Sequence, residues 1–155
     1  MEGISVEGKF THLHFLHATG WGSPRSIEDG TRIGHYLVRY ADKSEVEIPI
    51  EYGSDVRDWW NWDDSTATKR SDVAWEGDNP ATTGFGVSIR LYHTAWKNPK
   101  PEQKIAAIDY VSVNETVCAP FCVAISGENA SGEKKEPKPN QKRTENGPRS
   151  GTSNP

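Results

Sequence analysis

The chain has 155 residues, a formal net charge of −4 and 26% charged residues. This length allows one ordinary domain with extensions. No apolar run approaches the roughly 18 residues of a transmembrane helix, so no membrane span is predicted. Residues 1–17 lack a basic start followed by an apolar stretch, so no signal peptide is predicted in the chain as given.

The last part of the sequence, residues 127–155, contains no Val, Ile, Leu, Met or aromatic residue. A segment of this composition cannot bury enough apolar surface to offset the entropy of ordering. We therefore predict a folded module over 1–126 and a disordered polar tail over 127–155. The tail has six basic and four acidic residues, a balance of +2, so the module carries −6. Such an acidic module argues against nucleic-acid binding, which needs a basic surface.

The first elements predicted in chain order are strands over 3–6 and 9–18. The clearest element follows at 36–50, "YLVRYADKSEVEIPI", where apolar and polar residues alternate on both sides of the turn "ADKS". This pattern predicts a β-hairpin with one solvated face. Pro49 cannot donate to a ladder, which places its strand near a sheet edge or a bulge.

Three further strands are predicted over 84–96, 104–113 and 120–126. In the first, the alternation predicts Val87, Ile89 and Leu91 toward the core, with Ser88 and Arg90 toward solvent. No segment predicts a helix. About seven short strands separated by Gly- and Pro-rich turns predict an all-β fold, an antiparallel β-sandwich of the jelly-roll kind.

Two sets of side chains raise the question of metal or disulfide chemistry. Cys118 and Cys122 lie roughly 13 Å apart if they share a strand, so two free thiols are expected. His12 and His14 share one face of their strand, and His17 lies on the other. The histidine pair could hold a metal in a small metal-dependent enzyme. No acidic residue follows at cupin-like spacing, however, so ordinary strand histidines are the preferred interpretation.

The segment "DVRDWWNWDD" (55–64) holds three of the six tryptophans. Whether it is extended or a turn of helix, its three indoles cannot all point into one core, so at least one should lie outside it. An exposed indole can stack on a sugar ring while polar neighbours bond the hydroxyl groups. The alternative is that the tryptophans only close the end of the sandwich. The predicted ligand-binding residues are Trp59, Trp60, Trp62 and Trp96, with Arg57, Asp58, Asn61 and Asp63 as hydroxyl partners; Trp21 and Trp75 are further candidates.

The acids of the same segment allow a second interpretation. Clustered carboxylates are the ligands that Ca²⁺ prefers, and the segment holds Asp55, Asp58, Asp63 and Asp64. It lacks the residue order of an EF-hand, and a solvated acidic loop is the simpler interpretation. No cofactor is therefore predicted.

Five segments follow one another in a recognisable order: "LHFLHATGWG" (13–22), "GHYLVRYADKSEVEIPIEYGSDVRDWW" (34–60), "AWEGDNP" (74–80), "RLYHTAWKNPKPEQKIAAIDYVSV" (90–113) and "APFCVAISGE" (119–128). Over about residues 4–128 the chain resembles galactose-binding-like, carbohydrate-binding β-sandwich modules of bacterial secreted or multidomain proteins. The resemblance implies that Asp58–Trp59–Trp60 and Trp96–Asn98–Pro99 are defining positions, by binding or by packing. It also implies an extracellular or periplasmic location.

The resemblance also implies one or two strands ahead of "ISVEGKF", whereas only three residues precede that segment in this sequence. Three explanations are open: a fragment, a mis-assigned start, or a version with an uncovered sheet edge that favours self-association. We expect a non-catalytic module that binds an oligo- or polysaccharide. The alternatives are a structural or protein-interaction sandwich without a small ligand and, less favoured, the metal-dependent enzyme.

Overall fold

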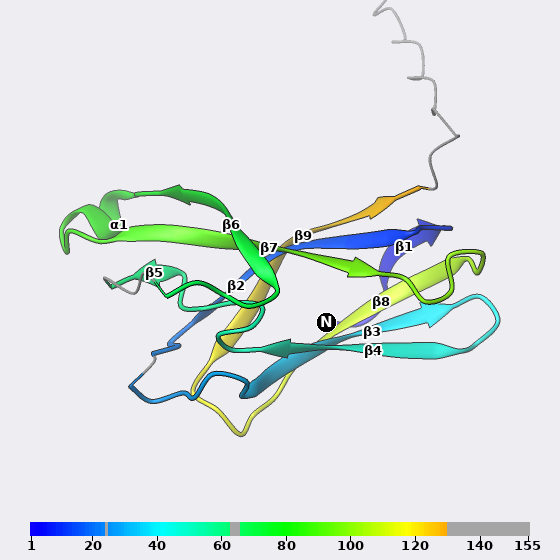
Figure 1. Cartoon of the computed structure of the whole chain (residues 1–155), viewed down its shortest axis with the longest axis horizontal. Coiled ribbons are helices and arrows are strands. Elements are labelled where there is room, and N and C mark those ends of the chain that lie inside the picture. Colours follow the sequence, from blue (N-terminus) through cyan, green and yellow to red (C-terminus); the bar gives the residue numbers. More distant parts are fainter. Residues whose placement is uncertain (24, 63–65, 130–155) are drawn as a thin grey trace, which may run out of the picture.

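The computed structural model describes residues 1–23, 25–62 and 66–129 and shows two antiparallel sheets packed as layers (Figure 1). The first sheet has the order β1 (Ile4–Gly8), β8 (Ile105–Ser112), β3 (Arg32–Tyr40), β4 (Glu45–Glu51). The second has the order β5 (Trp60–Asn61), β7 (Ser88–Lys97), β2 (His12–Gly20), β9 (Ala119–Glu128), and β6 (Ser71–Gly77) also pairs with β7. The predicted all-β, antiparallel two-sheet class is confirmed.

The hairpin formed by β3 and β4 follows the alternation in the sequence. Val38 pairs with Val46, and the turn closes where the Tyr40 N–H donates to the Ser44 carbonyl at 2.9 Å. β4 is the last strand of its sheet, as Pro49 predicted, because a strand with one free side needs fewer backbone donors. The apolar face of this hairpin supplies one wall of the core.

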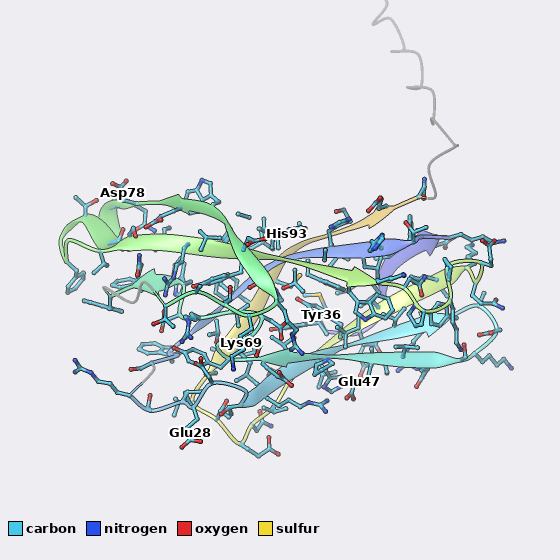
Figure 2. All side chains as sticks on the ribbon, viewed as in Figure 1. Glu28, Tyr36, Glu47, Lys69, Asp78 and His93 are labelled. Atoms are coloured by element: carbon cyan, nitrogen blue, oxygen red, sulfur yellow. The ribbon has the colours of Figure 1, made fainter. Side chains whose placement is uncertain are left out.

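The two layers are joined by aromatic packing and one hydrogen-bonded chain. The ring of Phe15 on β2 stacks on Tyr36 of β3 with centroids 4.1 Å apart. The Tyr36 hydroxyl is hydrogen-bonded to His17 Nδ1 at 3.0 Å, and His17 Nε2 to Thr94 Oγ1 at 2.9 Å. Figure 2 shows Tyr36 between the layers. These hydrogen bonds place His17 between the sheets, on the opposite face of β2 from His12 and His14, as predicted.

The predicted facing of β7 is wrong. Tyr92 belongs to the core and Thr94 bonds the buried His17, so the inward set is the one that contains Arg90, which is 4% exposed. Leu91 lies on the opposite face, where it pairs with Trp75 of β6. The alternation was recognised correctly but assigned to the wrong face; Trp75 of the neighbouring strand β6 gives Leu91 an apolar neighbour on the outer face of the sheet.

Some elements were not predicted, and several predicted strands begin or end at other residues; β3, for example, begins at Arg32. A single helical turn, α1 (Pro80–Thr83), begins at Asn79, whose side chain accepts from the Ala81 and Thr82 N–H groups. β6 was not predicted, and β9 runs two residues beyond the predicted module boundary at 126. Residues 130–155, most of the predicted tail, lie outside the described residues. In the described part of the chain, no helix has the length and apolarity to cross a membrane.

Candidate ligand-binding site

A pocket of about 430 Å³ lies at the end of the sandwich where β2 finishes and β5 begins. Its described lining residues are Gly20, Trp21, Asp58, Trp59, Trp60 and Trp62. Four indoles therefore meet around one carboxylate. The two contributing segments are separated along the chain by β3 and β4, and the fold brings them together.

The backbone of Trp59 is fixed between two strands of the second sheet. Its N–H donates to the Thr19 carbonyl at 2.8 Å, and its carbonyl accepts from the Arg90 N–H at 2.8 Å. The indole meets the ring of Phe121 edge to face at 5.7 Å. Trp59 is therefore both a wall of the pocket and a half-buried extension of the core.

Trp60 and Trp62 form an exposed aromatic surface beside the pocket. They point to the same side because they are two residues apart along an extended segment, and their rings stack at 5.5 Å with 29° between planes. The ring centroid of Phe85, in the loop after α1, lies 5.7 Å from that of Trp60 and 6.1 Å from that of Trp62. Trp62 is 55% exposed, which confirms that at least one indole of the triplet lies outside the core.

Trp21 is held in an unfavourable backbone conformation. Its φ is 61°, in the left-handed region that bulky residues rarely adopt, and its side chain is 78% exposed. The following Gly22 is needed, because a Cβ there would lie 2.7 Å from the Tyr52 ring. A left-handed conformation costs a non-glycine residue about 1–2 kcal/mol. The loop thus presents an indole to solvent at an energetic cost, a feature typical of binding surfaces.

Asp58 is the charged group of the pocket. Its Oδ1 accepts from the Trp60 N–H at 2.8 Å, and the carboxylate also accepts from the Gly22 backbone N–H. Burial raises the pKa of Asp58 above its ordinary value, although the two N–H groups and the positive charge of Arg90 act in the opposite direction. A carboxylate offers about four acceptor positions, so two remain for a ligand.

Arg57, predicted as a hydroxyl partner, is 1% exposed and does not line the described pocket. Its Nη2 donates to Asp29 Oδ2 at 2.9 Å, and its guanidinium lies over the Tyr52 ring at 5.4 Å. The alternation of the segment buries Arg57 while Asp58 reaches the surface. The contacts of Arg57 therefore stabilise this segment from inside the fold.

Asn61 faces away from the indoles. It lines a second, more polar pocket of about 370 Å³, where its Nδ2 donates to Glu76 Oε1 at 3.4 Å. The same glutamate accepts from Ser88 Oγ. The structure therefore does not bring Asn61 together with Trp60 and Trp62. Asp63 lies outside the described residues.

Trp96 lies near the opposite end of β7 from the residues that pair with β5, and packs partly buried against the core. The neighbouring Asn98 is 2% exposed and bonds the Tyr40 hydroxyl at 2.6 Å and the Phe10 carbonyl at 2.8 Å. These contacts give Asn98 a packing role. Trp75 on β6 is 46% exposed but is not among the described residues of the pocket.

The described carboxylates that the sequence suggested as calcium ligands, Asp55 and Asp58, do not form one site. Asp55 is 3% exposed and is bound by Arg70, whose Nη2 lies 2.6 Å from Oδ2, and by the Glu51 N–H. Asp64, like Asp63, is outside the described residues. Elsewhere, His14 Nδ1 is hydrogen-bonded to His93 Nε2 at 2.9 Å. Among the residues described, no group of three or more His, Cys, Asp or Glu side chains could hold a metal ion.

Both cysteines are free, as expected, with Cys118 buried and Cys122 partly so. The sequence analysis did not identify Phe85 as a residue of the aromatic surface; the only signal was its position directly after the turn "GDNPATTG".

Comparison of the chain with family models, with curated proteins and with solved structures finds no match in any of the three.

Proposed function

We propose that the protein is a non-catalytic module that binds a saccharide in the pocket formed by Trp21, Asp58, Trp59, Trp60 and Trp62. The observation that supports this most is the gathering of four of the six tryptophans at one pocket, with two of them more than half exposed. Large exposed indoles beside a polar group provide both a stacking face and a hydrogen-bond partner for a sugar.

Binding without catalysis is favoured by the number of acids. Glycoside hydrolysis ordinarily uses two carboxylates on either side of the scissile bond. The described lining of this pocket supplies one, Asp58. Its Oδ1 is also engaged by the Trp60 N–H, which suits a fixed acceptor better than a group that must exchange protons.

The test is calorimetric titration of the whole chain with a panel of soluble oligosaccharides. We expect Trp21→Ala and Trp62→Ala to weaken binding about tenfold each, the effect of losing a central aromatic contact. Trp75→Ala is the matched control, because Trp75 is also exposed but lies outside the pocket. The proposal fails if no saccharide binds, or if the control loses as much affinity as the pocket variants.

A second candidate function, self-association, is favoured by a different observation. An apolar groove of about 460 Å³ lies between the edge strands β1 and β9, and its lining includes Val6, Phe121 and Ile125. We propose that a second copy of the chain adds to β9 through backbone pairing, since an edge strand is the same on both copies. Sedimentation would show a dimer that Val123→Lys, on the exposed part of β9, returns to monomer. A monomeric wild type at high concentration would exclude it.

A further inference from the structure

The aromatic pocket has a negative electrostatic character. Its only ionisable group among the described lining residues is the carboxylate of Asp58, and none of those residues is Lys or Arg. The faces of the four indoles carry the negative part of the ring quadrupole. Each indole also carries one N–H donor, so the lining can bond neutral hydroxyl groups, but its only charge among the described residues is the Asp58 carboxylate.

The Asp58 carboxylate has acceptor capacity in reserve. Two backbone N–H groups, those of Trp60 and Gly22, fix it in position and leave about two of its lone-pair positions unused. The guanidinium of Arg90 is 4% exposed and its Nε donates to the Asp58 backbone carbonyl at 3.1 Å. The carboxylate therefore remains the polar centre of a largely aromatic pocket.

The balance of forces at Asp58 supports a cationic partner. Burial raises its pKa in spite of both N–H groups and of Arg90, so its negative charge is less well stabilised than in water. A ligand cation within hydrogen-bond distance would stabilise that charge in the site. The indole faces would add cation–π attraction, which is strongest with tryptophan.

The openness of the site argues for a sugar amine over a bare ammonium ion. Trp21 is 78% exposed and Trp62 is 55% exposed, so the indoles do not enclose the pocket. Phe85, 65% exposed, continues the stacked surface of Trp60 and Trp62 beyond the pocket. A pyranose ring can lie on this extended surface while a charged substituent reaches Asp58.

We infer that the ligand is a saccharide carrying protonated amino groups, of the 2-amino-2-deoxy class, whose ammonium pairs with Asp58 while its ring stacks on the indoles. This inference rests on the proposed function and specifies its ligand class.

The test compares three oligosaccharides of equal length and β-1,4 linkage by calorimetry with the full chain at about pH 6, where an aliphatic amine is protonated. The probes are oligomers of glucosamine, of N-acetylglucosamine and of glucose. We expect the glucosamine oligomer to bind about tenfold more tightly than the other two, the effect of one partly desolvated charge pair and cation–π contact. Raising the salt concentration should weaken this probe alone.

Asp58→Asn removes the charge and keeps an amide oxygen for the backbone N–H of Trp60. It should abolish the preference for the glucosamine oligomer over the glucose oligomer, and thermal melting checks that the variant is folded. If this variant does not fold, the salt dependence of the wild type still decides the matter.

The outcomes separate the two proposals. Equal affinity for all three probes, or a preference for the neutral ones, overturns the inference about charge and leaves saccharide binding intact. Binding of tetramethylammonium chloride with no binding of any oligosaccharide overturns both, and so does the absence of binding by every probe.

Discussion

The indole of Trp59 meets the ring of Phe121 edge to face at 5.7 Å, so one wall of the aromatic pocket is also the end of the hydrophobic core. Trp62 shares the pocket but is 55% exposed and contacts mainly Trp60 and Phe85. Trp59 thus combines a packing role with the proposed ligand contact, whereas Trp62, three residues along the chain, has little packing role.

The first prediction follows from this separation. Trp59→Ala should lower the free energy of unfolding by about 2 kcal/mol, because it removes a half-buried aromatic side chain, whereas Trp62→Ala should change it by less than about 0.5 kcal/mol. Urea denaturation measures both. Equal losses in the two variants would show that Trp62 is as much a part of the core as Trp59.

The second prediction concerns the strained backbone of Trp21. Trp21→Gly removes a left-handed non-glycine residue, so the free energy of unfolding should stay the same or rise by up to about 1 kcal/mol while saccharide affinity falls about tenfold. Lys43→Gly is the matched control, since Lys43 has a φ of 69° in the β3–β4 turn, away from the pocket. It should match the stability effect and keep binding intact. A marked loss of stability in Trp21→Gly would indicate that the indole has a packing role.

How much of this could be predicted from sequence depends on the range of the interactions concerned. The β3–β4 hairpin was predictable because its alternation and its turn are local. The facing of β7 was not, because Arg90 is accommodated inside by the Asp58 carbonyl and by the Tyr92 ring, 5.5 Å away, both set by the fold. The exposure of an indole near 59–62 followed from geometry, but its assembly with Trp21 depends on the Thr19–Trp59 backbone bond between distant segments.

The third prediction concerns Asp55, which the sequence offered as a calcium ligand and the structure pairs with Arg70. Asp55→Ala should lower the free energy of unfolding by about 2–3 kcal/mol, because it leaves the Glu51 N–H and the Arg70 guanidinium without their buried acceptor. Asp72→Ala, on the exposed strand β6, should have an effect of about 0.5 kcal/mol or less. Chemical denaturation compares the two. A small effect at Asp55 would mean that Glu51, whose Oε2 already accepts from Arg70 Nη2 at 3.0 Å, is a sufficient partner for Arg70.

The fourth prediction concerns pH and His17. Burial lowers the pKa of His17 to about 4, from 6.5 in an unfolded chain, and the nearby His93 acts in the same direction. Between these values the unfolded chain binds the proton and the folded protein does not, so acid favours unfolding. The stability associated with neutral His17 is therefore fully present above about pH 6.5 and falls as the pH approaches 4. The loss is about 3 kcal/mol for a shift of this size.

His17→Gln isolates this effect, because an amide can still bond the Tyr36 hydroxyl and Thr94 Oγ1 but does not titrate in this range. Denaturation curves collected from about pH 7 to about pH 4 should show a steeper decline of stability in the wild type than in the variant. The other acids titrate in both proteins, so the difference between the two curves reports His17 alone. Parallel curves would mean that His17 takes up its proton in the folded protein at an ordinary pH, and that the bridge from Tyr36 to Thr94 tolerates a charged ring between the sheets.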